Sequence, residues 1–359
     1  MIAWTNYYRP QKFSELELVS VREQMLRYQK GANFPQVLLF TGPKGTGKTS
    51  TARILAATLN TPANLPTIQK AYLQPDLGSS LAPLADPEIE HEDIRQIIQG
   101  NSYAAVEIDA ASHRGIDDVR ALQEQVYVRP SLSPVLVYIL DEVHMFTNEA
   151  FNALLKILEE PPRHAFFILA TTEAHKIPAT VISRCVRVNY TKATNSEQIA
   201  NFHRILADQK LTADDKVLEE IATLADGSFR DGVKYLQTVA QTGSITSENV
   251  QKLLMGDITA HIQKLTTLMI KKDEQGLINF FASLRQNNVD ENFFRQSLFS
   301  FLHQQLIDNI KNNPVSLNFK QTHFLLKQLL AARANSPIPY LDLELTLLEI
   351  CEQAKNKQK

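Results

Sequence analysis

The sequence predicts an α/β P-loop domain built on a parallel sheet, followed by two all-helical domains. Between residues 36 and 190, short and nearly continuous apolar runs alternate with helical patterns. Such runs are typical of strands that helices bury on both faces, and the alternation indicates a doubly wound sheet. After about residue 192 no further strand pattern occurs, and the apolar spacing stays helical.

Composition narrows the class of protein. The chain has 359 residues, enough for two or three domains, and 44% of them are hydrophobic. A net charge of -2 excludes a wholly basic nucleic-acid binder, although it does not exclude a local basic patch. The two cysteines, Cys185 and Cys351, provide neither a disulfide framework nor a four-cysteine zinc site. We expect a cytoplasmic protein, because the sequence shows no secretory signal and no apolar run of membrane-spanning length.

The sheet domain is predicted to span residues 1–192. Its helical stretches include residues 49–59 and 148–160. Within it, residues 60–102 contain five prolines, so we interpret them as an insertion with short helices and no core element. The predicted strands are VLLF at 37–40, AVEI at 105–108, VLVYIL at 135–140, FFILA at 166–170 and VRVNY at 186–190.

Two helical domains are predicted beyond the sheet. Residues 193–243 contain three short helical stretches with brief connections, which favours a small three-helix domain. Residues 244–359 form a second helical domain, whose last helix carries leucines on two faces and is therefore expected to be enclosed by neighbours or by an oligomer contact. The three short helices are predicted at 196–209, 213–226 and 228–241.

A phosphate-binding motif follows the first strand. Residues 42–49 read GPKGTGKT and match G-x-x-x-x-G-K-S/T between a strand and a helix. Glycines let the backbone curl around phosphate oxygens, and the helix N-terminus attracts anions. Lys48 is predicted to reach the β- and γ-phosphates of ATP, and the Thr49 hydroxyl to bind Mg²⁺. The predicted nucleotide-binding set is Gly42, Pro43, Lys44, Gly45, Thr46, Gly47, Lys48, Thr49 and Ser50.

A second motif, VLVYILDEVH, ends a strand in two acidic residues. An acid at the carboxyl end of a central strand lies beside the phosphate loop in such sheets. We therefore predict that Asp141 binds Mg²⁺ and that Glu142 orients and deprotonates the attacking water. The alternative is a strand that ends in two solvated acids. His144 is interpreted as a packing or polar surface residue.

Five motifs in this order resemble a known family. The phosphate loop, DEVHMF, FNALLKILEEPP, LATTEAHKIPATVISRC and DGSFRD are together similar to the gamma/tau ATPase subunit of bacterial DNA polymerase III, an AAA+ clamp loader. The resemblance implies an AAA+ sheet domain, a three-helix lid and an all-α collar for oligomerisation. It also implies ATP-driven loading of a sliding clamp onto primed DNA, in a hetero-oligomeric ring with other clamp-loader subunits.

The resemblance also assigns roles to individual residues. By resemblance, Thr172 corresponds to the polar sensor that positions the lytic water. Arg184 corresponds to the arginine finger that reaches the ATP of a neighbouring subunit. Arg230 is similar to a second sensor, which contacts the γ-phosphate from the lid. The alternative for both arginines is an ordinary surface or helix-capping cation. The residues that correspond to the adenine pocket are Tyr8, Arg9 and Pro10.

The implied DNA contacts are Arg114, Arg120 and Lys156. Contacts with the phosphate backbone suit a machine that acts at any primer end. The alternative is that these three residues are solvated helix charges.

The chain departs from the family at one implied metal site. Family members carry four cysteines in a zinc module between the phosphate loop and the DEVH motif. Residues 60–102 of this chain contain no cysteine, so no zinc is predicted. Holoenzyme membership would place the chain with the DNA-directed DNA polymerases, although no polymerase-like acidic constellation occurs. The alternative functions are a non-hydrolysing scaffold, like the delta-prime subunit, and another AAA+ DNA motor, such as a Holliday-junction helicase.

Overall fold

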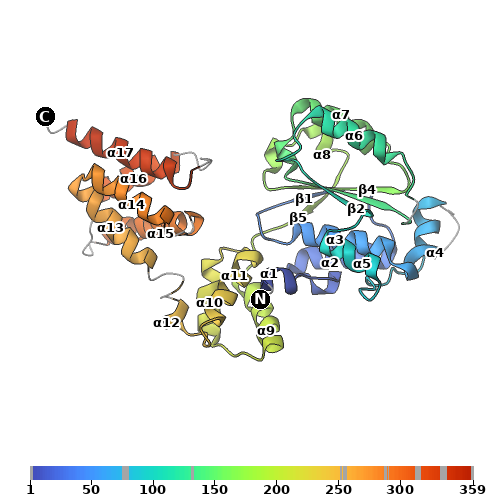
Figure 1. The fold of residues 1–359 in the computed structure, drawn as a ribbon, viewed down its shortest axis with the longest axis horizontal. Coiled ribbons are helices and arrows are strands. Elements are labelled where there is room, and N and C mark those ends of the chain that lie inside the picture. Colours follow the sequence, from blue (N-terminus) through green and yellow to red (C-terminus); the bar gives the residue numbers. More distant parts are fainter. Residues whose placement is uncertain are drawn as a thin grey trace. The chain divides into compact units, whose positions relative to one another are not determined.

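The computed structural model of the chain describes residues 3–74, 81–130, 133–250, 253, 257–286, 289, 291–311, 317–331 and 338–356. The chain divides into two compact units, Met1–Gln241 and Thr242–Lys359. The first unit contains the sheet, and the second is helical (Figure 1). None of the helices that the structure describes combines the length and the hydropathy of a membrane span. The predicted domain boundaries at residues 192 and 243 stay predictions.

The first unit is built on a five-stranded parallel sheet with the strand order β2-β3-β4-β1-β5. Each predicted apolar run forms one strand, so the predicted parallel α/β sheet is confirmed. Strands β1 and β4 are buried at every position. The strands are β1 Val37–Thr41, β2 Ala105–Asp109, β3 Leu136–Asp141, β4 Ala165–Thr171 and β5 Val186–Asn189.

Helices cover both faces of this sheet (Figure 1). On one face α2, α3 and α5 bury Met25, Ile54 and Ile97 in one apolar cluster with strand residues. On the other face α6, α7 and α8 form a second cluster that contains Leu122 and Leu154. These helices are α2 Val19–Gly31, α3 Lys48–Asn60, α5 Glu92–Gln99, α6 Ile116–Val126, α7 Asn148–Glu159 and α8 Ala179–Ile182.

The prediction that residues 60–102 contain no core element is wrong, because Ile68 in the first half and helix α5 in the second half are buried in the core. Helix α5 packs against α3 and buries Ile94, Ile97 and Ile98 in the cluster beneath the sheet. Their spacing gives one apolar helix face, in a stretch of the segment that contains no proline. The short segments before it are η2 Pro62–Asn64, α4 Leu65–Ile68 and the π-helical η3 Gln69–Leu73.

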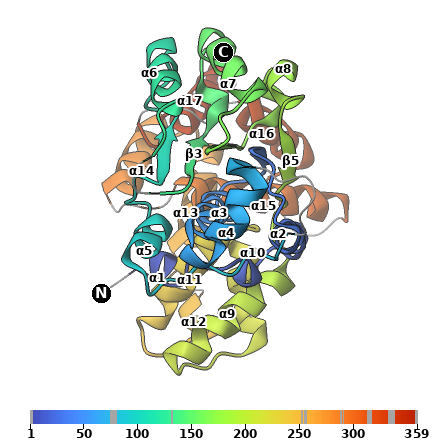
Figure 2. The same cartoon turned by 90° about the vertical axis from the view of Figure 1, so that its right-hand side faces the viewer.

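Three helices near the end of the first unit form the lid, at one end of this unit in both views (Figures 1 and 2). Thr194 and Glu197 form a capping box at the start of α9, and Ser228 caps α11. The N-terminal helix α1 packs against α11, where the backbone N–H of Trp4 donates to Gln237 Oε1 at 2.9 Å. The bounds are α1 Trp4–Tyr7, η1 Phe13–Glu15, α9 Asn195–Gln209, α10 Asp215–Leu224 and α11 Phe229–Ala240.

The second unit has an aromatic core formed by Phe280, Phe281, Phe294 and Tyr340. In α17 one predicted apolar face is buried, at Leu343 and Leu347, whereas Leu345 on the other face is 51% exposed. Neighbouring helices of the chain therefore cover one of the two apolar faces of α17. The helices are α12 Ser247–Val250, α13 Asp257–Lys271, α14 Glu274–Gln286, α15 Glu291–Ile310, α16 Phe319–Ala331 and α17 Leu341–Asn356.

Candidate functional site

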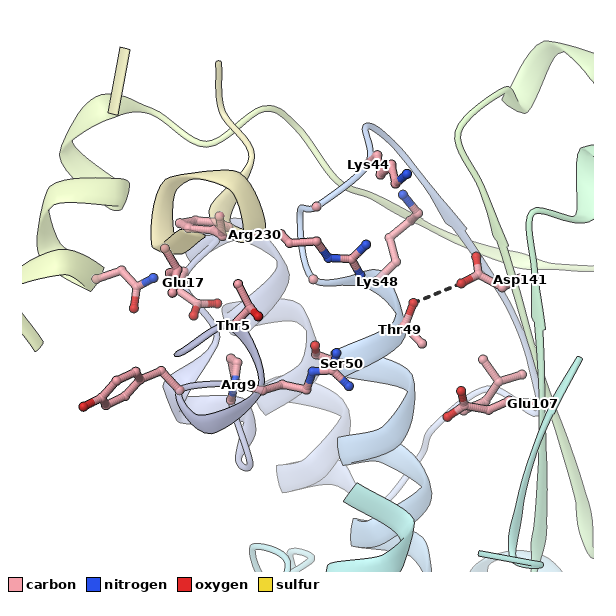
Figure 3. Close-up of a pocket in the computed structure, with 18 of the residues that line it drawn as sticks. Thr5, Arg9, Glu17, Lys44, Lys48, Thr49, Ser50, Glu107, Asp141 and Arg230 are labelled. Atoms are coloured by element: carbon pink, nitrogen blue, oxygen red, sulfur yellow. Dashed lines mark hydrogen bonds between the residues drawn. The ribbon is translucent and has the colours of Figure 1, made fainter. Parts of the chain in front are cut away.

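A cavity of about 480 Å³ opens in the first unit where the sheet, the N-terminal segment and the lid meet. Its lining includes most of the predicted nucleotide-binding residues and both predicted acids. Figure 3 shows Thr49 and Asp141 on one side and Glu17 on the other. The lining residues used below are Trp4, Tyr8, Arg9, Pro10, Glu17, Lys44, Gly45, Gly47, Lys48, Thr49, Ser50, Asp141, Glu142, Asn201, Phe229, Arg230 and Val233.

The loop between β1 and α3 needs glycine at two positions for different reasons. Gly45 has φ +77°, and a side chain there would meet Ser228 Oγ at 2.1 Å. Gly47 has φ +97° at the N-cap of α3, and a side chain there would meet nothing within 4 Å. Left-handed backbone favours glycine at both. The loop therefore contacts the lid at Gly45 and faces open space at Gly47.

Lys48 folds back onto the same loop. Its Nζ donates to the carbonyl oxygens of Gly42 at 2.7 Å and Pro43 at 2.8 Å. Burial lowers the pKa of Lys48, and the carboxylates of Glu142 and Asp141 oppose that effect. Among the described residues, the hydrogen-bond acceptors of the Lys48 ammonium are two neutral carbonyls. A bound anion would give it a charged and therefore stronger acceptor.

Thr49 and Asp141 form a pair of oxygen donors at the start of α3 and the end of β3. The Thr49 hydroxyl donates to Asp141 Oδ2 at 3.1 Å, and Asp141 Oδ1 accepts the backbone N–H of Glu142 at 2.9 Å. Hydroxyl and carboxylate oxygens are the ligands that Mg²⁺ prefers, so the pair fits that ion. In the part of the chain that the structure describes, no group of three or more His, Cys, Asp and Glu residues is placed to bind a metal.

Glu142 begins a turn after β3 with φ +49°, a conformation that costs a non-glycine residue free energy. The Thr172 hydroxyl donates to Glu142 Oε2 at 3.1 Å. His144 Nδ1 lies 3.3 Å from the same oxygen and 3.0 Å from Thr171 Oγ1. Its Nε2 lies 3.3 Å from Glu173 Oε1. Two side chains thus orient the Glu142 carboxylate.

His144 is a residue whose place in the site we do not predict from the sequence. Its side chain is only 8% exposed and contacts carboxylates on both sides. The interpretation as a packing or surface residue misses this arrangement, because Glu173 follows a different strand. Its position two residues after Glu142 is the sequence feature that could have suggested it.

The lid joins the loop through the first turn of α11. The backbone N–H of Phe229 donates to the Gly45 carbonyl at 3.0 Å. One residue later, Arg230 reaches from α11 towards Lys48 (Figure 3), and its charge adds to the lowering of the Lys48 pKa. Burial also lowers the pKa of Arg9, and the charges of Arg53 and Arg230 lower it further. Arg9, Lys48 and Arg230 thus line the same cavity and lie near enough for their charges to interact.

The other side of the cavity has apolar and polar groups suited to a flat ring. The rings of Trp4 and Tyr8 pack edge to face with centroids 6.0 Å apart. The Tyr8 hydroxyl donates to Asp208 Oδ2 at 2.6 Å, and Pro10 lies beside it in the lining. Tyr8, Arg9 and Pro10 line the same cavity as Lys48, and their role in an adenine pocket stays a prediction. Trp4, Glu17 and Asn201 join them and are not predicted from the sequence.

Arg184 does not line this cavity. Its Nε donates to Glu159 Oε1 at 2.9 Å, and its Nη1 donates to the Thr180 carbonyl at 2.5 Å. The side chain is 30% exposed, so it lies at the surface. A role as an arginine finger for a neighbouring subunit stays a prediction.

The predicted DNA contacts lie on the layer of α6 and α7 and are exposed. Arg114 Nε donates to the Ala111 carbonyl at 2.8 Å just before α6. Arg120 Nη1 lies 3.5 Å from Asp117 Oδ1, and Lys156 lies on α7. Arg120 of α6, Lys156 of α7 and Arg114 just before α6 are thus exposed on one layer of helices, and their contact with DNA stays a prediction.

Comparisons with known proteins show which family the chain resembles in sequence. A sequence profile described as DNA polymerase III, delta subunit, matches residues 20–194. The chain is 36% identical over 288 residues to the DNA polymerase III subunit tau of Bacillus subtilis (strain 168), which covers 79% of this chain and 48% of that subunit. It is 31% identical over 316 residues to the DNA polymerase III subunit gamma of Buchnera aphidicola subsp. Baizongia pistaciae (strain Bp), which covers 86% of this chain and 80% of that subunit.

The chain spans about half the length of the Bacillus subunit and four fifths of the Buchnera subunit. Among solved structures, the Thermotoga maritima RuvB Holliday junction branch migration motor aligns at 17% identity over 77% of this chain and 85% of that chain, with a TM-score of 0.49. The similarity to these gamma and tau subunits shows that the chain belongs to the gamma/tau subunit family of DNA polymerase III.

Proposed function

We propose that the chain is an ATPase subunit of a clamp loader, which binds ATP with Mg²⁺ in the cavity and hydrolyses it. The observation that carries this proposal is that one cavity is lined by Lys48, Thr49, Asp141 and Glu142 of the sheet domain and by Arg230 of the lid. A non-hydrolysing scaffold would not need this set. No observation favours that alternative.

The phosphate groups would be bound by the glycine loop and Lys48. Backbone N–H groups at the start of α3 attract phosphate oxygens, and Lys48 would exchange two neutral carbonyls for charged oxygens. Thr49 and Asp141 would hold the Mg²⁺ ion. When bound, Mg²⁺ neutralises negative charge on the phosphate oxygens.

Glu142 is proposed to position and deprotonate the attacking water. Thr172 and His144 both contact Oε2 of this carboxylate and so hold it in one orientation. Such a positioned base contributes about 10²–10⁴ to a rate. Thr172 therefore acts on the carboxylate, in line with its proposed role as a sensor.

The lid would be coupled to the nucleotide through Arg230. A γ-phosphate that contacts both Lys48 and Arg230 would stabilise the arrangement in which the lid adjoins the loop. A ligand shifts a conformational equilibrium only by such a difference in contacts between states. In a ring, Arg184 of one subunit would supply a further guanidinium to the ATP of its neighbour.

The partners belong to the same proposal. We propose a hetero-oligomeric ring with other clamp-loader subunits, in which residues 244–359 form a collar and which acts on the sliding clamp and primed DNA in the cytoplasm. Arg114, Arg120 and Lys156 would contact the phosphate backbone. Any classification with the DNA-directed DNA polymerases would follow from holoenzyme membership alone.

Turnover of the assembled complex tests this proposal. ATP hydrolysis is measured for the chain with its partner subunits, clamp and primer–template, in wild type and Glu142→Gln. The variant should bind ATP with little change and turn over at least about 100-fold more slowly, because the base is lost. Glu124→Gln, an exposed carboxylate on α6, is the control. Equal turnover in wild type and Glu142→Gln would contradict the proposed base.

A further inference from the structure

Glu17 places a carboxyl group at the side of the cavity away from Asp141 (Figure 3). The side chain is 12% exposed. The same cavity is also lined by Trp4, Phe229 and Val233. Flat apolar surfaces of this kind suit an aromatic ring, so Glu17 lies where the edge of a nucleotide base would be read.

The carboxyl group of Glu17 has no strong side-chain partner among the described residues, and its own backbone N–H stabilises the ionised form. Its one ion pair is with Arg204, whose Nη2 lies 3.7 Å from Glu17 Oε1, too far for a hydrogen bond. That nitrogen instead donates to the Tyr8 carbonyl at 3.1 Å and to Asn201 Oδ1 at 2.9 Å. A buried polar group without a good partner is costly, and a ligand with matching groups would remove that cost.

We propose that Glu17 determines base specificity, by pairing in its protonated form with the N1 and amino edge of adenine. This inference rests on the proposed binding of ATP in the cavity. A protonated carboxyl offers one donor and one acceptor side by side, whereas an ionised carboxylate offers two acceptors. Adenine presents an acceptor, N1, next to its amino donor. Guanine can pair with both forms: its O6 acceptor and N1–H donor match the protonated carboxyl, and its N1–H and amino donors match the ionised one, whereas adenine matches the protonated form alone.

The surroundings of Glu17 make both forms available near neutral pH. Burial raises the pKa of Glu17 to about 7, and Glu15 of η1 adds to that effect. Arg204 of α9 and Arg22 of α2 oppose it. Arg230 of α11 and Tyr8 line the same cavity. Adenine should therefore bind with uptake of a proton above neutral pH, and the preference for ATP over GTP should fall as the pH rises.

The test is the ratio of the GTP and ATP dissociation constants between about pH 6 and pH 8.5, measured by equilibrium binding to the full chain with Mg²⁺. The ratio cancels the titration of the terminal phosphate, which the two nucleotides share. For wild type the ratio should decline above pH 7, with a limit of about tenfold per pH unit for one linked proton.

Three variants complete the experiment. Glu17→Gln carries an amide donor and an acceptor at every pH, so its ratio of dissociation constants should not change with pH. Glu15→Gln removes a charge that raises the pKa of Glu17, so its ratio should still decline, beginning at a lower pH than in wild type. Glu17→Ala should bind both nucleotides with little preference.

The outcomes separate this inference from the proposed function. If wild type binds neither nucleotide, the proposed ATP site fails. If wild type binds both with a ratio that is flat in pH, or if Glu17→Gln shows the same decline as wild type, the assignment of Glu17 is overturned while the ATP site stands.

Discussion

The guanidinium of Arg184 is bound to the carboxylate of Glu159 on its own chain, with Arg184 Nε 2.9 Å from Glu159 Oε1. Arg184 follows α8, and Glu159 ends α7, so the contact joins two elements on one face of the sheet. Under the proposed function, Arg184 must leave this partner before it can contact the ATP of a neighbouring subunit. Glu159 therefore competes with the phosphate for Arg184.

Substitutions at the two ends of this pair should act in opposite directions in the assembled complex. Arg184→Ala should slow ATP turnover by about 10³-fold or more while ATP binding stays nearly unchanged, because a finger acts on the transition state. Glu159→Gln should raise turnover at low ATP by up to about fivefold, since an exposed ion pair contributes about 0.2–1 kcal/mol. Steady-state hydrolysis measures both effects.

Two controls accompany this pair. Glu160→Gln changes the exposed neighbouring carboxylate, and Arg27→Ala removes an exposed arginine of α2 that donates only to a carbonyl of its own helix. Both should match wild type. If Arg184→Ala turns over at the wild-type rate in the complex, Arg184 has no part in hydrolysis.

His144→Phe should lower turnover without weakening ATP binding. The phenyl ring keeps the bulk of the side chain but loses both ring nitrogens, so Glu142 and Glu173 lose a shared partner. A less well-oriented base should cost about tenfold in rate. Single-turnover hydrolysis measures the chemical step, and His175→Phe, at a 75% exposed side chain, is the control. An unchanged single-turnover rate would remove His144 from the positioning of Glu142.

Gly45→Ala should weaken ATP binding, because the new Cβ would lie 2.1 Å from Ser228 Oγ and would force the lid away from the loop. Gly243→Ala is a matched control: its φ of +88° is as strained for alanine as the +77° of Gly45, yet nothing lies within 4 Å. Equilibrium binding of ATP compares the two. Equal affinities would show that contact between the lid and the loop does not contribute to nucleotide binding.

The pH dependence of stability offers a test of Glu17 that does not involve nucleotide. Its pKa is raised from 4.5 to about 7, so the folded chain binds more protons than the unfolded chain between these values. Stability should therefore fall as the pH rises from 4.5 to 7 and then level off, by at most roughly 3 kcal/mol. Glu17→Gln should lack this contribution.

Denaturant unfolding between pH 4.5 and 8, followed by the emission of Trp4, measures the difference between the two proteins. Trp4 is the single tryptophan and lines the same cavity, so it reports on the first unit. Parallel pH profiles for wild type and Glu17→Gln would contradict a raised pKa at Glu17.

Features that depend on neighbours in the sequence could be predicted without coordinates. The apolar runs that became β1 to β5, and the glycine loop between a strand and a helix, are local patterns with one dominant physical solution. Helix α5 is not predicted, because its three isoleucines follow a proline-rich stretch that is typical of turns. Its amphipathic spacing was present in the sequence all the same.

Features that depend on contacts between distant residues could not be predicted. His144 joins Glu142 to Glu173 only because β3 and β4 are neighbours in the sheet. The burial of Glu17, and the commitment of Arg204 to other acceptors, depend on how α9 of the lid packs near residue 8. Neither arrangement has a sequence spacing that would reveal it.

Equilibrium binding of labelled ATP with Mg²⁺ to wild type and Lys48→Ala tests the central claim most directly. Lys48→Ala removes the charged group bound to the Gly42 and Pro43 carbonyls, and Lys216→Ala, an exposed lysine of α10, is the control. A charge-assisted contact contributes about 1.5–3 kcal/mol, so Lys48→Ala should bind at least about tenfold more weakly, while Lys216→Ala binds like wild type. Equal ATP affinity in wild type and Lys48→Ala would contradict the nucleotide site.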